Sequence, residues 1–227
     1  MIGVFDSGAG GLTAITELRR LTPSVDICFL ADKKNAPYGT KSKDELIRLV
    51  CADITRLRRA GADEILMACC TASTIYDALP NKMRAIARPI IRPTAKEAAR
   101  ITYNGKIGVI ATETTVASSA FSKELTKYPS VKEVHEVSTQ RLVSLVECGA
   151  IDGKVTSRER DELYRLVRPM REYGIDTLIL GCTHFSHLER EISGCLPGVR
   201  LVSASREGAR EIVRSNKNTG TGKMIFL

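Results

Sequence analysis

One segment of the chain recurs more than a hundred residues later. LRRAGADEILMACCT at 57–71 aligns without gaps on MREYGIDTLILGCTH at 170–184. Each copy contains a helix end, a glycine suited to a helix C-terminus, a short apolar run and a cysteine. A weaker similarity joins 3–18 to 108–125. The repeat predicts an α/β half that was copied once, giving two pseudo-symmetric lobes. The residues in register are Gly61 with Gly174, Asp63 with Asp176, and Cys69 with Cys182.

Short apolar runs alternate with segments of helical periodicity, which predicts an α/β fold with mostly parallel sheets flanked by helices. Several runs are apolar throughout, as buried parallel strands are. The expected strands are 2–5, 26–30, 64–68, 89–91, 106–111, 133–137, 177–181, 199–203 and 223–227. The expected helices are 12–21, 43–61, 94–101, 115–125, 140–149 and 157–174, and a loop is expected at 215–223.

The chain is long enough for one large domain or two small ones. Its 227 residues can form two cores, and the nearest candidate boundary is RPTAKE at 92–97. In parallel sheets, ligands bind beyond the carboxyl ends of the strands. Two facing lobes would therefore bring Cys69 and Cys182, each at the end of its strand, to one cleft, where we expect the active site.

Composition excludes several classes of protein. No apolar stretch approaches the roughly 20 residues of a membrane span, and no signal peptide is recognisable, so we expect a cytoplasmic protein without a membrane partner. Seven cysteines are irregularly spaced without a CxxC pair, and only three histidines are present, so no metal site is expected. The net charge is +8, but the basic residues are interleaved with acids, which favours solvated helix faces over nucleic-acid binding.

The glycine-rich segment FDSGAGGL at 5–12 follows the first expected strand. It lacks the GK[ST] ending of a P-loop, and a carboxylate at Asp6 would repel a phosphate. We interpret it as a tight turn that exposes Asp6 and Ser7, with helix-start amides free to hold a carboxylate. A plain turn capped by Ser7 is the alternative.

The polar loop ADKKNAPYGT at 31–40 contains a PYG turn. Such a turn would present Tyr38 and the bare backbone of Gly39 to a ligand, although PYG also occurs in ordinary loops. The loop is therefore a candidate binding element.

The two repeat-equivalent cysteines carry the strongest chemical signal. Cys69 precedes an expected helix start, where backbone amides can lower the pKa of a thiol. Cys182 is followed by Thr183 and His184, and the imidazole can exchange a proton with the thiol. A single cysteine is more often an inert core residue. A matched pair across a cleft suits inversion of a carbon centre, with a base on one face and an acid on the other; a disulfide is the alternative, and a reducing cytosol disfavours it.

These motifs resemble those of the glutamate racemases, a family of the cofactor-independent aspartate/glutamate racemase superfamily. FDSGAGGL, ADKKNAPYG, ACCTAS, GVIATETT and LGCTHF stand in the family's order within about the first 190 residues. The resemblance implies an N-terminal lobe at 1–93 that is completed by 206–227, and a C-terminal lobe at 94–205. It also implies interconversion of L- and D-glutamate without cofactor or metal, with D-glutamate supplied to peptidoglycan. The partner would be a small amino acid, and a homodimer is left open.

The resemblance also assigns residue roles by position. Cys69 and Cys182 match the proton-transfer cysteines, Asp6 and His184 match the groups that assist them, and Glu147 matches an accessory acid. The positions that match substrate-binding residues are Asp6, Ser7, Pro37, Tyr38, Gly39, Cys70, Thr71, Thr183 and His184.

Two departures from the family pattern bear on the substrate. The family usually reads ACNTAS, so Cys70 replaces a two-donor amide with a weak S–H donor. SASREGA at 203–209 has no acid where many members read Asp-Ser. The alternatives are a racemase for aspartate or another amino acid, a ligand-binding homologue with reduced turnover, and a redox sensor that uses Cys69 and Cys70.

Overall fold

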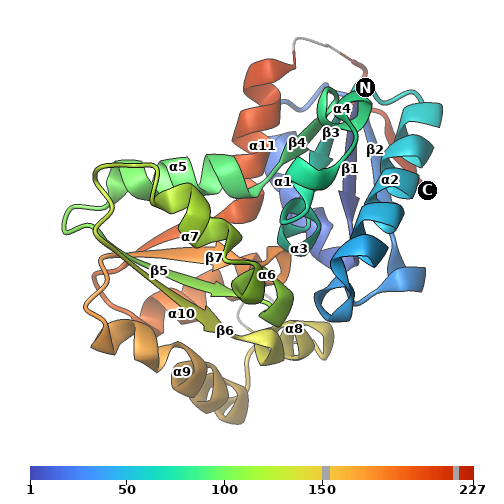
Figure 1. Ribbon diagram of the computed structural model, residues 1–227. Coiled ribbons are helices and arrows are strands. Elements are labelled where there is room, and N and C mark those ends of the chain that lie inside the picture. Colours follow the sequence, from blue (N-terminus) through green and yellow to red (C-terminus); the bar gives the residue numbers. More distant parts are fainter. Residues whose placement is uncertain (150–153, 217–219) are drawn as a thin grey trace.

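A computed structural model describes residues 1–149, 154–216 and 220–227, and it contains two α/β lobes (Figure 1). The first sheet has the strand order β4-β3-β1-β2-β9 and the second has the order β6-β5-β7-β8. Every pairing within the two sheets is parallel. The expected fold class of two mostly parallel sheets flanked by helices is therefore confirmed. The strands are β1 (Ile2–Asp6), β2 (Ile27–Ala31), β3 (Glu64–Met67), β4 (Ala87–Pro89), β5 (Lys106–Ala111), β6 (Glu133–Ser138), β7 (Thr177–Gly181), β8 (Arg200–Ser203) and β9 (Met224–Phe226).

Helices cover both faces of each sheet. The α2 helix packs on one face of the first sheet, and α1 and α11 pack on the other. In the second lobe, α8, α9 and α10 cover one face, and α5 and α7 cover the other. The α-helices are α1 (Leu12–Leu21), α2 (Lys43–Arg59), α3 (Cys70–Ser73), α4 (Asn81–Arg84), α5 (Ile91–Ile101), α6 (Glu113–Ser118), α7 (Ala120–Leu125), α8 (Gln140–Glu147), α9 (Ser157–Glu172), α10 (Glu189–Cys195) and α11 (Ala204–Ser215). The 3₁₀ helices are η1 (Ala9–Gly11), η2 (Lys33–Asn35), η3 (Tyr38–Thr40), η4 (Tyr76–Ala78) and η5 (Thr183–Leu188).

The sequence repeat corresponds to a structural repeat. The order β4-β3-β1-β2 in the first lobe is matched by β8-β7-β5-β6 in the second. Gly61 follows α2 with φ of 96° and Gly174 follows α9 with φ of 65°, which is the left-handed region that glycine adopts at helix ends. The strands β3 and β7, each followed by its cysteine, therefore occupy the same place in their lobes.

A second pair of glycines explains why the copies share a packing arrangement. Gly3 on β1 and Gly108 on β5 lie at matching positions. A Cβ atom on Gly3 would lie 2.9 Å from Cβ of Ala62, and one on Gly108 would lie 2.6 Å from Cδ1 of Ile175. Ala62 and Ile175 are themselves repeat-equivalent. In both lobes, the absence of a side chain lets the segment before the cysteine-bearing strand pack directly on the first strand.

The chain crosses between the lobes twice. It enters the second lobe after β4 through α5, and it returns through α11, which packs against α1. The last strand, β9, pairs with β2 at the edge of the first sheet (Figure 1). Of the loop expected at 215–223, residues 217–219 lie outside the described residues, as do residues 150–153 of the expected C-terminal lobe.

Several element boundaries differ from the prediction. β4 ends at Pro89, because Ile91 already begins α5. The helix expected at 115–125 is two helices, broken where Ser119 adopts a left-handed φ of 52°. The helix start expected after Cys69 is α3, whereas α4, α10 and α11 were not predicted. In α11, Gly208 lowers the intrinsic helix propensity, yet a Cβ there would lie 2.6 Å from Cγ1 of Ile90, so close packing requires the glycine.

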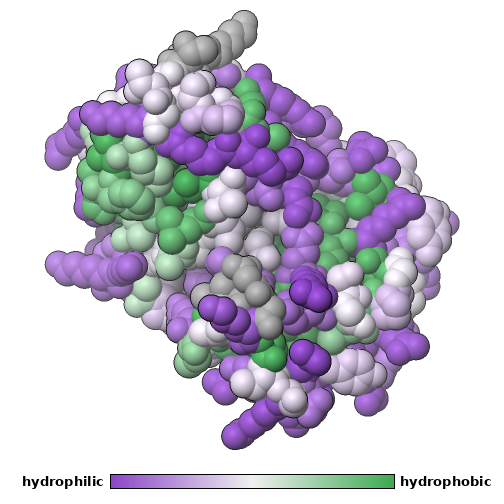
Figure 2. All heavy atoms as spheres, turned by 180° about the vertical axis from the view of Figure 1, so that it is seen from behind, coloured by the Kyte–Doolittle hydropathy of each residue, from purple (hydrophilic) through white to green (hydrophobic). Residues whose placement is uncertain are grey.

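The face shown in Figure 2 is mainly hydrophilic, with hydrophobic residues in separate patches. Many arginines pair with acids on their own helix, as Arg100 does with Glu97 and Arg168 with Glu172. This agrees with the interpretation of the basic residues as solvated helix faces. In the described part of the chain, no helix combines the length and hydropathy that spanning a bilayer requires.

We expect Gly108→Ala to destabilise the protein by about 1–3 kcal/mol, because the added methyl group overpacks a filled core. Its Cβ would also lie 2.7 Å from Sδ of Met170. Gly194→Ala in α10 is the matched control, since nothing lies within 4 Å of its Cβ position. The control should unfold at the wild-type temperature or above it. Thermal unfolding of both variants checks the prediction, and equal melting temperatures would contradict it.

Candidate active site

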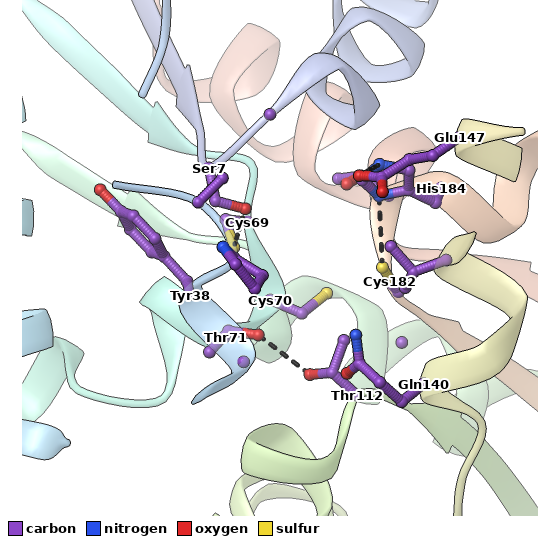
Figure 3. Close-up of a pocket in the computed structure, with 17 residues that line it drawn as sticks. Ser7, Tyr38, Cys69, Cys70, Thr71, Thr112, Gln140, Glu147, Cys182 and His184 are labelled. Atoms are coloured by element: carbon purple, nitrogen blue, oxygen red, sulfur yellow. Dashed lines mark hydrogen bonds and ion pairs between the residues drawn. The ribbon is translucent and has the colours of Figure 1, made fainter. Parts of the chain in front are cut away.

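A cavity of about 290 Å³ lies between the lobes, beyond the carboxyl ends of the central strands (Figure 3). Its volume suits a small molecule. Both lobes contribute to its wall, including Cys69 from the first lobe and Cys182 from the second. Of the predicted site residues, all except Asp6 line it. The lining residues are Ser7, Gly8, Ala36, Pro37, Tyr38, Gly39, Cys69, Cys70, Thr71, Thr112, Gln140, Val143, Glu147, Gly181, Cys182, Thr183 and His184.

Cys69 stands two residues beyond the end of β3 and is the N-cap residue of α3. Its Sγ lies 3.5 Å from Oγ of Ser7. Burial, with a smaller contribution from the Asp6 charge, raises the pKa of Cys69 to about 11, although the backbone N–H groups of Ala72 and Ser7 act in the opposite direction. The helix start predicts a pKa below that of a free thiol, and this expectation is wrong. Desolvation outweighs the amides, and Cys69 is a thiol at neutral pH.

Cys182 follows β7 and belongs to a short chain of polar groups (Figure 3). Its Sγ lies 3.7 Å from Nδ1 of His184, and Nε2 of His184 lies 3.6 Å from Oε1 of Glu147. Burial raises the pKa of Cys182, while the backbone N–H of His184 opposes the shift. His184 is buried and Glu147 is largely exposed, so the chain connects the Cys182 thiol to the protein surface.

Asp6 is fully buried and connects the two lobes instead of lining the cavity. It accepts hydrogen bonds from the backbone N–H of Gly8 at 2.9 Å and from Oγ1 of Thr183 at 3.1 Å. Burial raises the pKa of Asp6, against the lowering effects of His184 and the Gly8 amide. The predicted contact of Asp6 with a substrate stays a prediction.

The glycine-rich turn at 5–12 allows close contact between the two lobes. A Cβ atom on Gly10 would lie 2.8 Å from Nδ1 of His184 and would overlap Oγ1 of Thr183. Only a residue without a side chain lets the two strand-end segments approach this closely. The interpretation of FDSGAGGL as a tight turn fits this arrangement.

The Tyr38 side chain points away from the cavity (Figure 3). Its hydroxyl lies 2.7 Å from Oδ2 of Asp32 and 2.8 Å from Oδ2 of Asp53. A phenol has one proton to donate, so its contact with the second carboxyl is best satisfied when that group carries a proton. Burial is the main cause that raises the pKa of Asp53, to about 6. The loop therefore brings Gly39 and the body of Tyr38 to the cavity wall, while the Tyr38 hydroxyl is held by the two carboxyl groups.

Sequence reasoning missed several wall residues. Thr112 lies in the quoted motif GVIATETT but was not singled out, and its Oγ1 lies 3.0 Å from Oγ1 of Thr71. Gln140 and Val143 come from α8, where no sequence signal marks them. The segment 203–209 also has a structural explanation, because Ser203 caps α11 by accepting from the backbone N–H of Arg206. Serine and aspartate both fill that role, so an acid is not needed there.

Comparison with known proteins places this site in a family. The sequence pattern of the Asp/Glu/Hydantoin racemase family matches residues 14–212. A glutamate racemase from Aquifex aeolicus is 36% identical over 226 residues, covering 98% of this chain and 86% of that protein. The crystal structure of a glutamate racemase isoform from Bacillus anthracis matches this structure with a TM-score of 0.87 at 31% sequence identity. The match covers 100% of this chain and 86% of the Bacillus anthracis chain. A glutamate racemase from Francisella tularensis, solved with D-glutamate, gives a TM-score of 0.87 at 27% identity over 99% of this chain and 86% of its own.

Two parallel α/β lobes with a cysteine at each equivalent strand end are the architecture of an amino-acid racemase, which is an isomerase. The chain belongs to the Asp/Glu/hydantoin racemase family. The resemblance to the glutamate racemases is thereby confirmed. Within the described residues, no group of three or more His, Cys, Asp or Glu side chains is arranged to hold a metal ion.

We expect Asp53→Asn to flatten part of the pH dependence of stability. The folded pKa of Asp53 is about 6, above its unfolded value of about 3.9. The protonated group therefore stabilises the fold fully below about pH 4, and this contribution is lost as the pH rises through 6. Between pH 5 and 7.5, wild type should lose about 1.4 kcal/mol relative to the variant.

Urea unfolding at the two pH values measures this difference. Asp44→Asn, at an exposed position on α2, is the control and should follow wild type. If the pH dependence of the unfolding free energy is identical in wild type and Asp53→Asn, Asp53 does not hold a proton beside the Tyr38 hydroxyl, and the account of this contact is wrong.

Proposed function

We propose that this protein interconverts L- and D-glutamate without a cofactor, using Cys69 and Cys182 as the two proton-transfer groups, and that it supplies D-glutamate for peptidoglycan in the cytoplasm. The observation that carries the proposal is the placement of the cysteines. They stand at repeat-equivalent strand ends, in opposite lobes, on the wall of one small cavity. A racemisation is symmetric between its two directions, and it calls for such a symmetric pair.

The reaction needs one thiolate and one thiol. With Cys69 as base, its sulfur takes the proton from Cα and leaves the electron pair on the carbon. The Cys182 thiol then donates its proton to the opposite face of the carbanion. The product leaves with inverted configuration, and the sulfurs have exchanged protonation states. The reverse reaction uses the same groups in opposite roles.

Both thiols must lose their protons more easily once substrate is bound. An amino acid brings an α-ammonium group, and a positive charge beside a buried thiol favours the thiolate. On one side, the amides of Ser7 and Ala72 favour a Cys69 thiolate. On the other side, His184 can accept the Cys182 proton and return it, with Glu147 beside its outer nitrogen.

The rest of the wall suits the carboxylates of an amino acid. Ser7, Thr71 and Thr112 provide hydroxyl donors, and Gly39 brings bare backbone to the cavity. Because both lobes line the cavity, bound substrate displaces water from between them, and this strengthens these hydrogen bonds.

A racemase for aspartate or another amino acid is the second candidate, and Cys70 is the observation that favours it. Its thiol lines the cavity, is buried, and has a pKa raised by that burial, so it is a neutral and weak donor. A panel of L-amino acids, followed by circular dichroism, separates the two candidates. A higher rate with aspartate than with glutamate would displace the leading proposal.

We expect Cys69→Ala and Cys182→Ala each to lower the rate of glutamate racemisation by at least about 10³-fold, because each removes an acid–base group that both directions need. Circular dichroism of L- and D-glutamate mixtures measures the rate. Cys51→Ala is the matched control, since Cys51 is a half-buried cysteine on α2 that does not line the cavity. Substantial racemisation by either cavity variant would refute the two-thiol mechanism.

A further inference from the structure

The Thr13 hydroxyl lies behind the second-lobe wall of the cavity and joins the two lobes. Thr13 is the second residue of α1 and is not among the residues that line the cavity. Its Oγ1 lies 2.7 Å from the carbonyl oxygen of Gly10 in the same lobe and 3.3 Å from that of Thr183 in the other. It also lies 2.6 Å from Oγ of Ser205, near the start of α11. One side chain therefore contacts three segments that meet behind the site.

The protons available determine which group donates in this cluster. A carbonyl oxygen only accepts, so Thr13 donates its one proton, which the Gly10 and Thr183 carbonyls share as a three-centre hydrogen bond. The Ser205 side chain is buried, and its hydroxyl donates to Oγ1 of Thr13. A hydroxyl that accepts such a bond is polarised and donates its own proton more strongly. Ser205 therefore strengthens the hydrogen bond from Thr13 to the Thr183 carbonyl.

The Thr183 carbonyl is one end of the peptide unit that contacts Cys182. The other end is the backbone N–H of His184, and the two point in opposite directions because the unit is planar and trans. The carbonyl is directed back to Thr13, whereas the N–H donates to the Cys182 sulfur and favours its thiolate. A donor that holds the carbonyl therefore also fixes the direction of the N–H and polarises it.

The segment after Cys182 depends on hydrogen bonds from outside it. This segment, η5, is a 3₁₀ helix of six residues, and such helices rarely exceed about three to four residues because their internal hydrogen bonds are poorly aligned. Farther along η5, Oγ of Ser186 lies 2.9 Å from Oγ of Ser203. Thr13 contacts the first residue of η5, directly after Cys182. Thr13 is therefore placed to hold the end of η5 that lies next to the thiol.

We propose that Thr13, supported by Ser205, is a positioning residue that keeps the N–H of the first η5 peptide directed at the Cys182 sulfur. This inference rests on the proposed function, because it concerns one of the two thiols that transfer protons there. Thr13 acts through the backbone of η5 and does not touch the substrate. Loss of its hydroxyl should disfavour the Cys182 thiolate and leave Cys69 unaffected, since the amides that favour a Cys69 thiolate belong to the first lobe.

Alkylation of the two cysteines by iodoacetamide tests the contact in Thr13→Val, which keeps the shape of the side chain and removes its hydroxyl. Only the thiolate reacts, and mass spectrometry of the digested protein gives a separate rate for Cys69 and for Cys182. If the pKa of Cys182 rises by about one, the thiolate becomes about tenfold scarcer but more nucleophilic, so the net rate falls about threefold. At one fixed pH below both pKa values, we expect this slowing at Cys182 and the wild-type rate at Cys69.

Two further variants serve as controls. Thr13→Ser keeps the hydroxyl and should restore the wild-type rate at Cys182. Thr16→Val makes the same substitution in α1, where Oγ1 of Thr16 donates to the Leu12 carbonyl of its own helix at 3.0 Å, and it should change neither rate. Faster alkylation of both cavity cysteines in Thr13→Val would mean that the substitution merely opens the cleft. Either this result or an unchanged rate at Cys182 would overturn the proposal.

Racemisation by Thr13→Val gives a second readout. A Cys182 thiol with a higher pKa is a weaker acid and its thiolate is scarcer, so kcat/KM for glutamate should fall about threefold to tenfold. The fall should be equal in both directions, because the two enantiomers have the same free energy in water. If wild type racemises no glutamate, the proposed function fails, whereas the alkylation rates still test the contact of Thr13 with η5. If wild type is active and Thr13→Val keeps its full kcat/KM, the inference about Thr13 fails alone.

Discussion

The structure depends on the close contact between the strand-end segments of the two lobes. The Asp6 carboxylate accepts from the Thr183 hydroxyl across the cleft, and Gly10 leaves no side chain between the lobes at this point. A larger residue at Gly10 would push Thr183 and His184 away, and with them the Cys182 side of the cavity. A buried hydrogen bond and a glycine thus hold the segment after β1 against the segment that follows Cys182.

Burial has two opposing effects on catalysis at this site. The same burial that strengthens hydrogen bonds to a substrate raises the pKa of both cysteines, so both are neutral thiols at pH 7. Backbone amides on one side and His184 on the other lessen this effect without cancelling it. In this account, the charge of the arriving substrate completes the activation, which couples proton transfer to binding.

Much of the architecture could be predicted, because it depends on periodicity and on the repeat. The gapless match of 57–71 with 170–184 predicted both lobes and placed Cys69 and Cys182 at one cleft. What could not be predicted depends on tertiary contacts. Packing on Ile90 requires Gly208 in α11. Because glycine has a low helix propensity, little in the sequence indicates this helix. The protonation of Cys69, the orientation of Tyr38 and the presence of Gln140 in the wall follow from burial and topology, which no local pattern encodes.

The central claim is that two thiols, each carrying one proton, act on opposite faces of the same carbon. The fate of the Cα proton in deuterated water tests this claim most directly. At low conversion of L-glutamate, separation of the enantiomers and mass spectrometry should find deuterium at Cα of the D-glutamate formed and none in the L-glutamate that remains. The reverse reaction should give the mirror result. Equal deuterium in both enantiomers, or a product that keeps its original proton, would mean that one group serves both faces and would contradict the account.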